Sequence, residues 1–539
     1  MKVPTVSTDL EAMQPCYDSD QTLFQRMQRW LWVDRVIWCL MIASLLLGLF
    51  QFNDRPLGGF TDDGHYVILA ESLVRGSGYR LINYPDAPLE HAFPPGWPLL
   101  LTPLVALLPG NFAVLHWYTY LFWLAAIPLL YRLFTRRLPA PYALAVAAVV
   151  ALNPSLIQHT SRVQSEAAYI FFAALTLTLF DLWNQKRREK SLWLLVAAFL
   201  LALATVTIRT IGISLVAGML LFLLFTSHWR TTATVVGILL LGLLPLAWFN
   251  MNQGGFLVFS QLYRVHVDDV VTQLGYFLRF WEHASFFPPE KLASFVAPVF
   301  DLRLMATLLS PGLNRTLSLI VLALLLCGWL RSLRRLEATD LYVLCYGAIL
   351  YLWIVYVEMI QPRLFAPLVP FLVFYLLYGF DWLLAWLPSA GRRHKQTFFW
   401  GVVALLLLAN LGRNGVQITR PTPSRWVDLP SAAAWVRENI PQDAIVMTTA
   451  PKYLYLHTRR LTVASPERKT GAIAPYIEQS GADYVIIRPR VDHQDEEERP
   501  AEQFAASNLL PFLQSDPARF QLAFEDQSGS VVIYRVVRP

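Results

Sequence analysis

Two adjacent carboxylates, Asp62 and Asp63, open a stretch whose residue types suit acid–base chemistry. They stand in Phe60-Thr61-Asp62-Asp63-Gly64-His65-Tyr66, just after the first strongly apolar segment of the chain. Ionised side chains are costly in lipid, so a pair of acids is expected in water or in a polar cavity, where such residues usually serve function. One member of such a pair can act as a general base and take a proton from a hydroxyl nucleophile.

Other ionisable residues occur in the short segments that join apolar runs. Arg162 and Glu166 precede one run, Arg209 separates two, and Glu358 and Arg363 flank the turn between two more. A guanidinium stays charged and donates hydrogen bonds in a planar fork, which suits phosphate at a membrane interface. Acids and arginines that converge at one membrane face therefore predict a site for an anionic, membrane-borne substrate.

Glu90 and His91 stand in the same loop as Asp62 and raise the question of a metal site. Adjacent side chains point in different directions and no third ligand has a suitable spacing, so a divalent metal is not favoured and we expect no cofactor. Tyr66, Glu90 and His91 are instead expected to support the acceptor or the loop. The chain also lacks a Gly-Lys-Ser/Thr phosphate loop, which argues against nucleotide hydrolysis.

The composition indicates a polytopic membrane protein. Hydrophobic residues make up 55% of the 539 residues, charged residues only 15%, and the mean hydropathy is +0.42, more than one soluble core requires. Runs of about 17 to 25 apolar residues are long enough to cross a bilayer, and about eleven are present. They begin near Val36, Phe112, Tyr142, Glu166, Ser191, Ile211, Thr232, Thr316, Leu341, Leu364 and Thr397.

The distribution of Lys and Arg orients these runs, because basic loops stay in the cytoplasm. The clusters are Arg26/Arg29/Arg35, Arg132/Arg136/Arg137, Lys186/Arg187/Arg188/Lys190, Arg230, Arg331/Arg334/Arg335 and Arg392/Arg393/Lys395. If all are cytoplasmic, the proline-interrupted segment 97–109 must be a re-entrant or surface-lying helix. We therefore expect a cytoplasmic segment at 1–35 and a membrane domain at 36–411, with outer loops at 53–111 and 251–313.

The character of the chain changes after Leu411. Residues 412–539 contain more charge and no spanning run, and helical and strand-like patches alternate, which predicts a small soluble α/β domain on the outer face. None of the four cysteines falls in this domain or in the outer loops, so we expect it to fold without disulfides. The net charge of +6 mostly reflects the basic inner loops, and no nucleic-acid partner is expected.

Several motifs resemble those of the GT-C superfamily of membrane glycosyltransferases. Within this superfamily, the chain looks most like the bacterial proteins related to protein O-mannosyltransferases and aminoarabinose transferases. The matching residues are Asp62-Asp63-Gly64-His65-Tyr66, Gly76-Ser77-Gly78-Tyr79, Phe93-Pro94-Pro95-Gly96-Trp97-Pro98, Gln164-Ser165-Glu166, Arg209 with Gly212, and Gln361-Pro362-Arg363-Leu364. Residues 412–539 are similar to the tail of many such bacterial proteins. The resemblance covers most of the membrane region.

The resemblance implies transfer of a sugar from a polyprenyl phosphate to an acceptor hydroxyl, with inversion, at the outer face of a bacterial plasma membrane. Asp62 is then the expected base, and Asp63 orients the acceptor or caps a helix. The expected phosphate-binding and substrate-binding residues are Arg162, Glu166, Arg209, Glu358 and Arg363. The acceptor stays open among protein, lipid and glycan.

The chain departs from its relatives at two places in the first loop. Relatives often have Asp-Glu where this chain has Asp62-Asp63. Aminoarabinose transferases typically have a Glu-Lys-Pro pattern where this chain has Leu89-Glu90-His91-Ala92. The second difference argues against an aminoarabinose donor.

Other interpretations stay open. Asp62 and Asp63 could serve only the start of an outer amphipathic helix running to about Val74, and the arginines could reach toward lipid headgroups. A transporter or flippase of lipid-linked sugars would also need outer arginines. It should show internal repeats or helices broken near the midplane, whereas we find no convincing repeat and the acids lie in an outer loop. A non-catalytic membrane scaffold would have little use for paired acids opposite arginines. The loop at 251–313 could be a lid or a structured connector.

Overall fold

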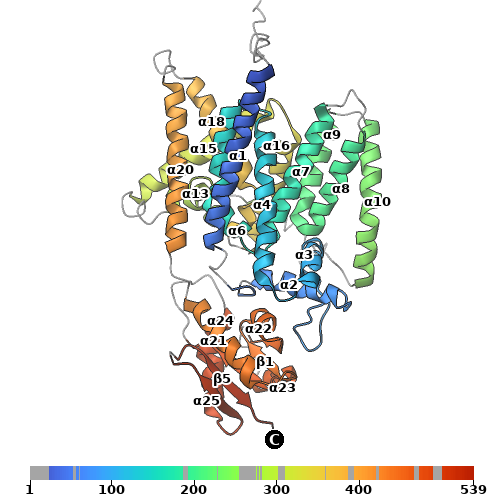
Figure 1. The fold of residues 1–539 in the computed structure, drawn as a ribbon, viewed down its shortest axis with the longest axis vertical. Coiled ribbons are helices and arrows are strands. Elements are labelled where there is room, and N and C mark those ends of the chain that lie inside the picture. Colours follow the sequence, from blue (N-terminus) through green and yellow to red (C-terminus); the bar gives the residue numbers. More distant parts are fainter. Residues whose placement is uncertain are drawn as a thin grey trace, which may run out of the picture.

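The structure is a computed structural model (Figure 1). It describes residues 23–51, 56–59, 61–185, 192–226, 229–253, 275, 278–279, 282–301, 310–357, 360–386, 394–419, 424–466, 473–489, 500–527 and 529–538.

A bundle of long helices forms the first and larger part of the molecule (Figure 1). Its main helices, with the short α6 that continues α5 after a bend, are α1 (Leu23–Gln51), α4 (Phe112–Phe134), α5 (Ala140–Ala151), α6 (Pro154–Thr160), α7 (Glu166–Gln185), α8 (Leu192–Ile208), α9 (Ile213–Thr226), α10 (Trp229–Gln253), α15 (Pro311–Leu333), α16 (Ala338–Val357), α18 (Val369–Ala385) and α20 (Lys395–Thr419). Short helical segments between them are η3 (Thr210–Gly212), η5 (Ala284–Phe286), α13 (Pro289–Ser294), η6 (Pro298–Asp301) and α17 (Pro362–Phe365).

Each predicted apolar run contains one of these helices. Among the described residues, five helices are long and apolar enough to cross a membrane, namely α4, α7, α15, α16 and α20. The bent pair α5 and α6, which meet at 56°, would make a sixth, and the remaining apolar helices are shorter. The chain is an integral membrane protein, whereas the number of crossings and their orientation stay predictions.

Local signals in the sequence set several helix starts. Asn111 and Asn153 each accept a hydrogen bond from the backbone N–H three residues on, at 3.3 and 3.1 Å, and so cap α4 and α6. A proline stands in the first turn of α5, α6, α15 and α18, where its missing N–H costs nothing.

Two helices of the first loop lie at one end of the bundle. The expected helix after Phe60 is α2 (Thr61–Val74), which runs across the bundle end (Figure 1). The expected non-spanning helix is α3 (Gly96–Leu107), and its 12 residues are about 18 Å long, shorter than a hydrocarbon core of about 30 Å. Trp97 and Leu101 of α3 are fully buried, which anchors this helix in the core of the bundle.

The C-terminal domain is the predicted α/β unit. Its helical elements are α21 (Ser424–Asn439), α22 (Pro451–Thr458), α23 (Ile473–Ser480), α24 (Pro500–Phe504), the π-helical turn η7 (Ala505–Leu509) and α25 (Leu510–Ser515). Its strands are β1 (Ile445–Thr448), β2 (Leu461–Ala464), β3 (Tyr484–Ile487), β4 (Phe520–Glu525) and β5 (Val532–Val536), in the order β2-β1-β3-β5-β4. Strand β1 is parallel to β2 and β3, and β5 is antiparallel to β3 and β4. Buried apolar side chains form a core on each face of the sheet.

The last helix of the bundle continues past the predicted boundary at Leu411 and ends at Thr419. Its buried amides explain the extension, because Asn410 donates to the Val149 carbonyl at 2.8 Å and Asn414 to the Leu152 carbonyl at 2.9 Å. These polar residues satisfy carbonyls at the end of α5 instead of ending α20.

The first loop and the C-terminal domain lie at the same end of the bundle (Figure 1). Arg459 of the domain donates to both carboxylate oxygens of Glu71 in α2, at 2.8 and 2.6 Å. The backbone N–H of Thr462 donates to the Asn83 carbonyl of the first loop at 2.8 Å. The two regions therefore share one side of the membrane, as the sequence predicts; that this side is the outer one stays a prediction.

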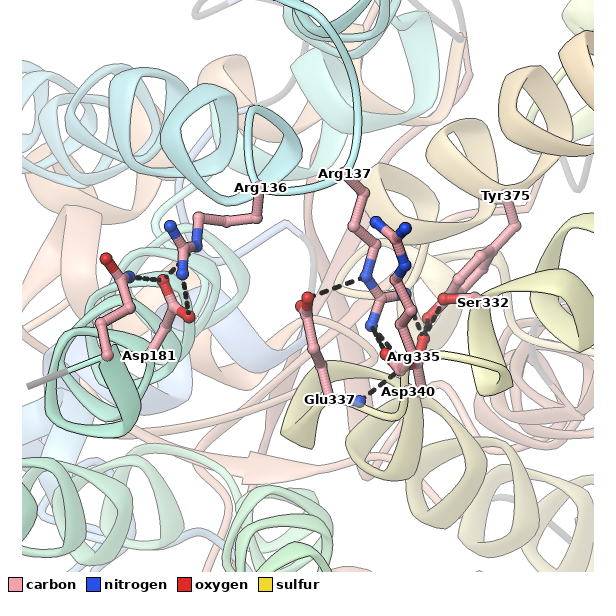
Figure 2. A network of polar contacts seen from close by, with 9 residues as sticks. Arg136, Arg137, Asp181, Ser332, Arg335, Glu337, Asp340 and Tyr375 are labelled. Atoms are coloured by element: carbon pink, nitrogen blue, oxygen red, sulfur yellow. Dashed lines mark hydrogen bonds and ion pairs between the residues drawn. The ribbon is translucent and has the colours of Figure 1, made fainter. Parts of the chain in front are cut away.

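A polar network ties helices together at the opposite end (Figure 2). Arg137, which follows α4, donates to both oxygens of the fully buried Asp340 at 2.9 and 2.6 Å. The hydroxyl of Tyr375 in α18 donates to the same carboxylate at 2.8 Å. Next to this group, Arg136 pairs with Asp181 of α7 at 2.7 Å. Basic residues predicted to lie on the inner side thus share one end of the bundle, away from Asp62.

Candidate functional site

Asp62 lies in the first turn of α2 and forms an ion pair with Arg363 of α17. Both side chains are largely buried, with 12% and 26% of their surface exposed. Burial favours a higher pKa for Asp62, but the charge and hydrogen bond of Arg363, together with the charge of Lys452, hold its pKa below the ordinary value. Asp62 is therefore ionised at neutral pH, as a general base must be.

Asp63 has a different environment from its neighbour. Its side chain is buried and accepts hydrogen bonds from the backbone N–H groups of Gly64, at 2.7 Å, and of Gly58. Burial raises the pKa of Asp63 to about 7, in spite of these hydrogen bonds and the nearby charge of Arg162. The two acids of the pair thus differ in ionisation near neutral pH, which suits them to different roles.

A second buried ion pair lies close to the first. Arg209, between α8 and η3, pairs with Glu166 at the start of α7. The same guanidinium donates to the Ser165 hydroxyl at 3.2 Å, and that hydroxyl lies 3.3 Å from the Tyr66 hydroxyl of α2. Tyr66 therefore links the helix that carries Asp62 to the Arg209–Glu166 pair.

Glu90 also returns to α2, where it pairs with His65. Its other oxygen accepts from the backbone N–H of Phe93 at 3.2 Å, and the Phe93 ring packs against His65 with ring centres 4.3 Å apart. Burial lowers the pKa of His65 more than the Glu90 contact raises it, so the ring is neutral at pH 7. His91, in contrast, is exposed.

Some buried polar atoms of this region have no hydrogen-bond partner among the described residues. They include Nδ1 of His65, Oε2 of Glu166 and both amide atoms of Gln164. Buried polar groups are nearly always satisfied in folded proteins, so a group of exceptions next to Asp62 indicates a place for water or for a polar ligand.

A glycine of the first-loop motif explains how α3 approaches this region. A Cβ added to Gly96 would lie 2.5 Å from the Thr207 hydroxyl and 2.6 Å from its carbonyl carbon. Only glycine lets the start of α3 contact the end of α8, two residues before Arg209. The motif residue therefore serves the packing that positions Arg209.

The structure brings most of the predicted site residues together at one end of the bundle. Arg162 is buried and its charge acts on Asp63, so it joins the two ion pairs. The predicted support residues differ in position, because Glu90 contacts His65 and the neighbouring His91 faces solvent. Glu358 and most of the second outer loop lie outside the described residues, so their roles stay predictions.

Lys452 of α22 is a charged residue near this site that the sequence analysis did not single out. Its charge acts on both Asp62 and His65. Nothing in its sequence context marks it, because it belongs to a domain whose contact with α2 depends on tertiary structure. His65 and Ser165 stood inside recognised motifs, but their contacts with Glu90 and Arg209 were not predicted.

In the part of the chain that the structure describes, no three His, Cys, Asp or Glu side chains gather closely enough to hold a metal ion. A divalent metal therefore stays a possibility that the sequence does not favour and that the structure does not test.

The fold and the site together define a class of protein. A bundle of apolar helices carries buried acid–arginine pairs at one end, where a long first loop and a C-terminal α/β domain cover it. These features define the class as an integral membrane protein with a buried, charged region at one end of its helical bundle.

Solved structures with the same fold belong to membrane glycosyltransferases. ArnT from Cupriavidus metallidurans in the apo state has a TM-score of 0.57 and 13% identity, covering 93% of this chain and 97% of its own. ArnT bound to undecaprenyl phosphate has a TM-score of 0.59 and 11% identity, and it covers the same shares of the two chains. The oligosaccharyltransferase AglB from Archaeoglobus fulgidus, in complex with an inhibitory peptide and a dolichol-phosphate, has a TM-score of 0.57 and 13% identity. The match covers 96% of this chain and 75% of AglB.

No protein-family model and no curated protein matches this chain. The solved structures nevertheless show that it has the GT-C fold, which confirms at the level of fold the resemblance seen in the first-loop motifs.

Proposed function

We propose that this protein is a membrane glycosyltransferase that moves a sugar from a polyprenyl phosphate to an acceptor hydroxyl. The observation that carries the proposal is the buried Asp62–Arg363 pair at the end of a GT-C bundle, beside the Arg209–Glu166 pair. An ionised carboxylate next to arginines provides both a base for the acceptor and cations for a leaving phosphate. The polyprenyl phosphates held by ArnT and AglB support this choice of donor class.

The proposed step balances as a single displacement. The acceptor oxygen forms a bond to the anomeric carbon of the sugar, and its proton passes to the Asp62 carboxylate. The bond from that carbon to the phosphate oxygen breaks, and the lipid phosphate leaves with the electron pair. Attack opposite the leaving group inverts the anomeric carbon.

The other site residues take supporting roles in this proposal. Arg363, Arg209 and Arg162 stabilise the charge of the phosphate as it develops. His65 Nδ1 and Glu166 Oε2, which have no hydrogen-bond partner among the described residues, offer hydrogen bonds to sugar or acceptor hydroxyls. We place the reaction at the outer face of the plasma membrane, because Asp62 lies at the end away from the basic clusters of Arg136 and Arg137.

Mass spectrometry of cell-envelope glycans and glycolipids tests the proposal. The comparison uses cells with the intact gene, a deletion, Asp62→Asn and, as a matched control at the opposite end of the bundle, Asp181→Asn. Loss of one sugar in the deletion and in Asp62→Asn, but not in Asp181→Asn, is the expected result. Membrane levels of each variant are checked by immunoblot.

Two outcomes would contradict this assignment. If Asp62→Asn keeps the sugar that the deletion loses, Asp62 is not the base and a transport role gains support. If the deletion changes no envelope sugar under conditions where the protein is expressed, glycosyl transfer is the wrong activity.

A further inference from the structure

Helix α22 of the C-terminal domain lies directly against the segment that leads into Asp62. A Cβ added to Gly58, whose φ is +83°, would lie 2.8 Å from the Tyr453 Cα. A Cβ added to Gly64 would lie 3.1 Å from the Lys452 Cβ and 2.8 Å from the Gly58 Cα. Two glycines therefore allow a backbone approach between the Asp62 segment and the first turn of α22 that no larger residue would permit.

Further contacts fix α22 in this position. The His457 ring nitrogen Nε2 lies 3.0 Å from the Leu57 carbonyl. Tyr455 and Leu456 are buried in the same apolar cluster as the helices of the bundle, although they belong to the other domain. Just past the end of α22, Arg459 holds Glu71 of α2. The helix is thus anchored on the first loop along its whole length.

This anchoring brings the Lys452 charge to the candidate site. Lys452 stands at the start of α22 and is half-buried. The groups that face Asp62 are Arg363 from α17, Lys452 from α22 and His65 from α2 itself. Lys452 lowers the pKa of both Asp62 and His65, which agrees with an ammonium group near both side chains.

We propose that Lys452 is a binding residue of this site, contributed by the C-terminal domain, and that its ammonium contacts the phosphate of the lipid donor beside Arg363. The inference rests on the proposed function and adds a role for the C-terminal domain. Asp62 faces one cation from the bundle, Arg363, and one from the C-terminal domain, Lys452. Two cations on one side of the candidate base can together bind a phosphate. A lysine acts on phosphate as a mobile point charge, which suits a group that must enter and leave.

Binding of undecaprenyl phosphate to the purified full-length protein in detergent tests this role. Native mass spectrometry compares the wild type with Lys452→Met, Lys452→Arg and, as a control cation on the same domain, Arg519→Gln. A hydrogen bond to a charged group corresponds to about a tenfold to hundredfold change in affinity, and we expect Lys452→Met to lose that much. Lys452→Arg and Arg519→Gln should bind like the wild type.

Undecaprenol, which has the same chain but no phosphate, separates a charge effect from a packing effect. It should bind equally to the wild type and to Lys452→Met if Lys452 acts on the phosphate. Equal loss of both lipids in Lys452→Met would mean that the variant disturbs the fold, and this would overturn the binding role.

The two proposals fail in different ways. If the wild type binds undecaprenyl phosphate and Lys452→Met binds it equally well, Lys452 is not part of the site while the proposed function stands. If the wild type does not bind this lipid more tightly than undecaprenol, the polyprenyl-phosphate function is wrong and the role of Lys452 falls with it.

Discussion

Arg363 and Asp62 lie 301 positions apart in the chain, and their side chains form a buried ion pair at one end of the helical bundle. The pair joins the first loop to the short helix that precedes α18. It therefore couples the ionisation of the candidate base to a segment far away in the sequence. A substrate phosphate that attracts Arg363 would at the same time change the environment of Asp62.

Replacing Arg363 should move the pH dependence of activity. Arg363 lowers the pKa of Asp62, whereas burial raises it. Arg363→Gln removes the lowering charge, so the pKa of Asp62 should rise. Because the base must be ionised, the acid limb of the pH profile of kcat/KM should move to higher pH. At neutral pH, kcat/KM should fall on the order of tenfold to a hundredfold. Arg363→Lys keeps the charge and should shift the limb less. An acid limb unmoved in Arg363→Gln would mean that it does not report Asp62.

Asp63 should make the stability of the folded protein depend on pH. Its pKa is about 7 in the folded state against an ordinary 3.8, so between these values the folded state holds more protons than the unfolded state. The free energy of unfolding therefore falls as pH rises from about 4 to about 7, by up to about 1.4 kcal/mol per pH unit, and is constant above.

Thermal unfolding of Asp63→Asn between pH 5 and 8 checks this contribution. The variant cannot ionise at this position, so its Tm should rise relative to the wild type as pH approaches 7. Asp443→Asn removes an exposed acid of the C-terminal domain and should keep the wild-type dependence. Parallel curves for Asp63→Asn and the wild type would contradict the raised pKa.

Gly64→Ala should be destabilising although it places the better helix former in α2. The added Cβ would lie 2.8 Å from the Gly58 Cα, and backbone must move to admit it. Overpacking of this kind costs about 1–3 kcal/mol, more than the gain of about 1 kcal/mol from helix propensity. In α16, a Cβ on Gly347 meets no atom within 4 Å, so Gly347→Ala should be neutral or stabilising. The Tm values of the two variants are measured in the same detergent. A Gly64→Ala protein as stable as Gly347→Ala would argue against the close contact between Gly64 and Gly58.

Asp340→Asn should reduce stability without changing the chemistry. Asp340 is fully buried and accepts hydrogen bonds from Arg137 and Tyr375. Arg137 also pairs with Glu337 at 3.0 Å, so the variant removes one of its two carboxylate partners, and the weakened buried hydrogen bonds should cost about 1–3 kcal/mol. Asp181→Asn breaks a more exposed pair with Arg136 and should cost less than about 1 kcal/mol. Activity per folded molecule should be unchanged in both. A loss of kcat in folded Asp340→Asn would mean that the two ends of the bundle are coupled.

Most of the fold could be predicted from the sequence, because a helix that crosses a lipid bilayer needs a long run of apolar residues. Each predicted run contains a helix, and α2 ends at Val74, where the sequence places it. The end of the membrane domain was less accessible, since Asn410 and Asn414 look like the start of a soluble segment. Their amides instead bond carbonyls of the neighbouring helix, which is a tertiary contact without a sequence signature.

The site was accessible in part. The sequence analysis expected acids and arginines to converge, and the structure places Asp62 and Arg363 next to each other. The partner of Glu90 was not predictable, because the loop folds back through a bridge between Arg80 and Leu89 and a residue with positive φ at Ala87. That reversal returns Glu90 to His65 and leaves His91 in solvent.

The network around Asp340 fastens one end of the bundle. It joins α4, α15, α16 and α18 through Arg137, Ser332, Asp340 and Tyr375, and the adjacent Arg136 adds α7. The other end is fastened by the pairs Asp62–Arg363 and Arg209–Glu166. The bundle can therefore be pulled apart at neither end without separating opposite charges, which low-polarity surroundings make costly.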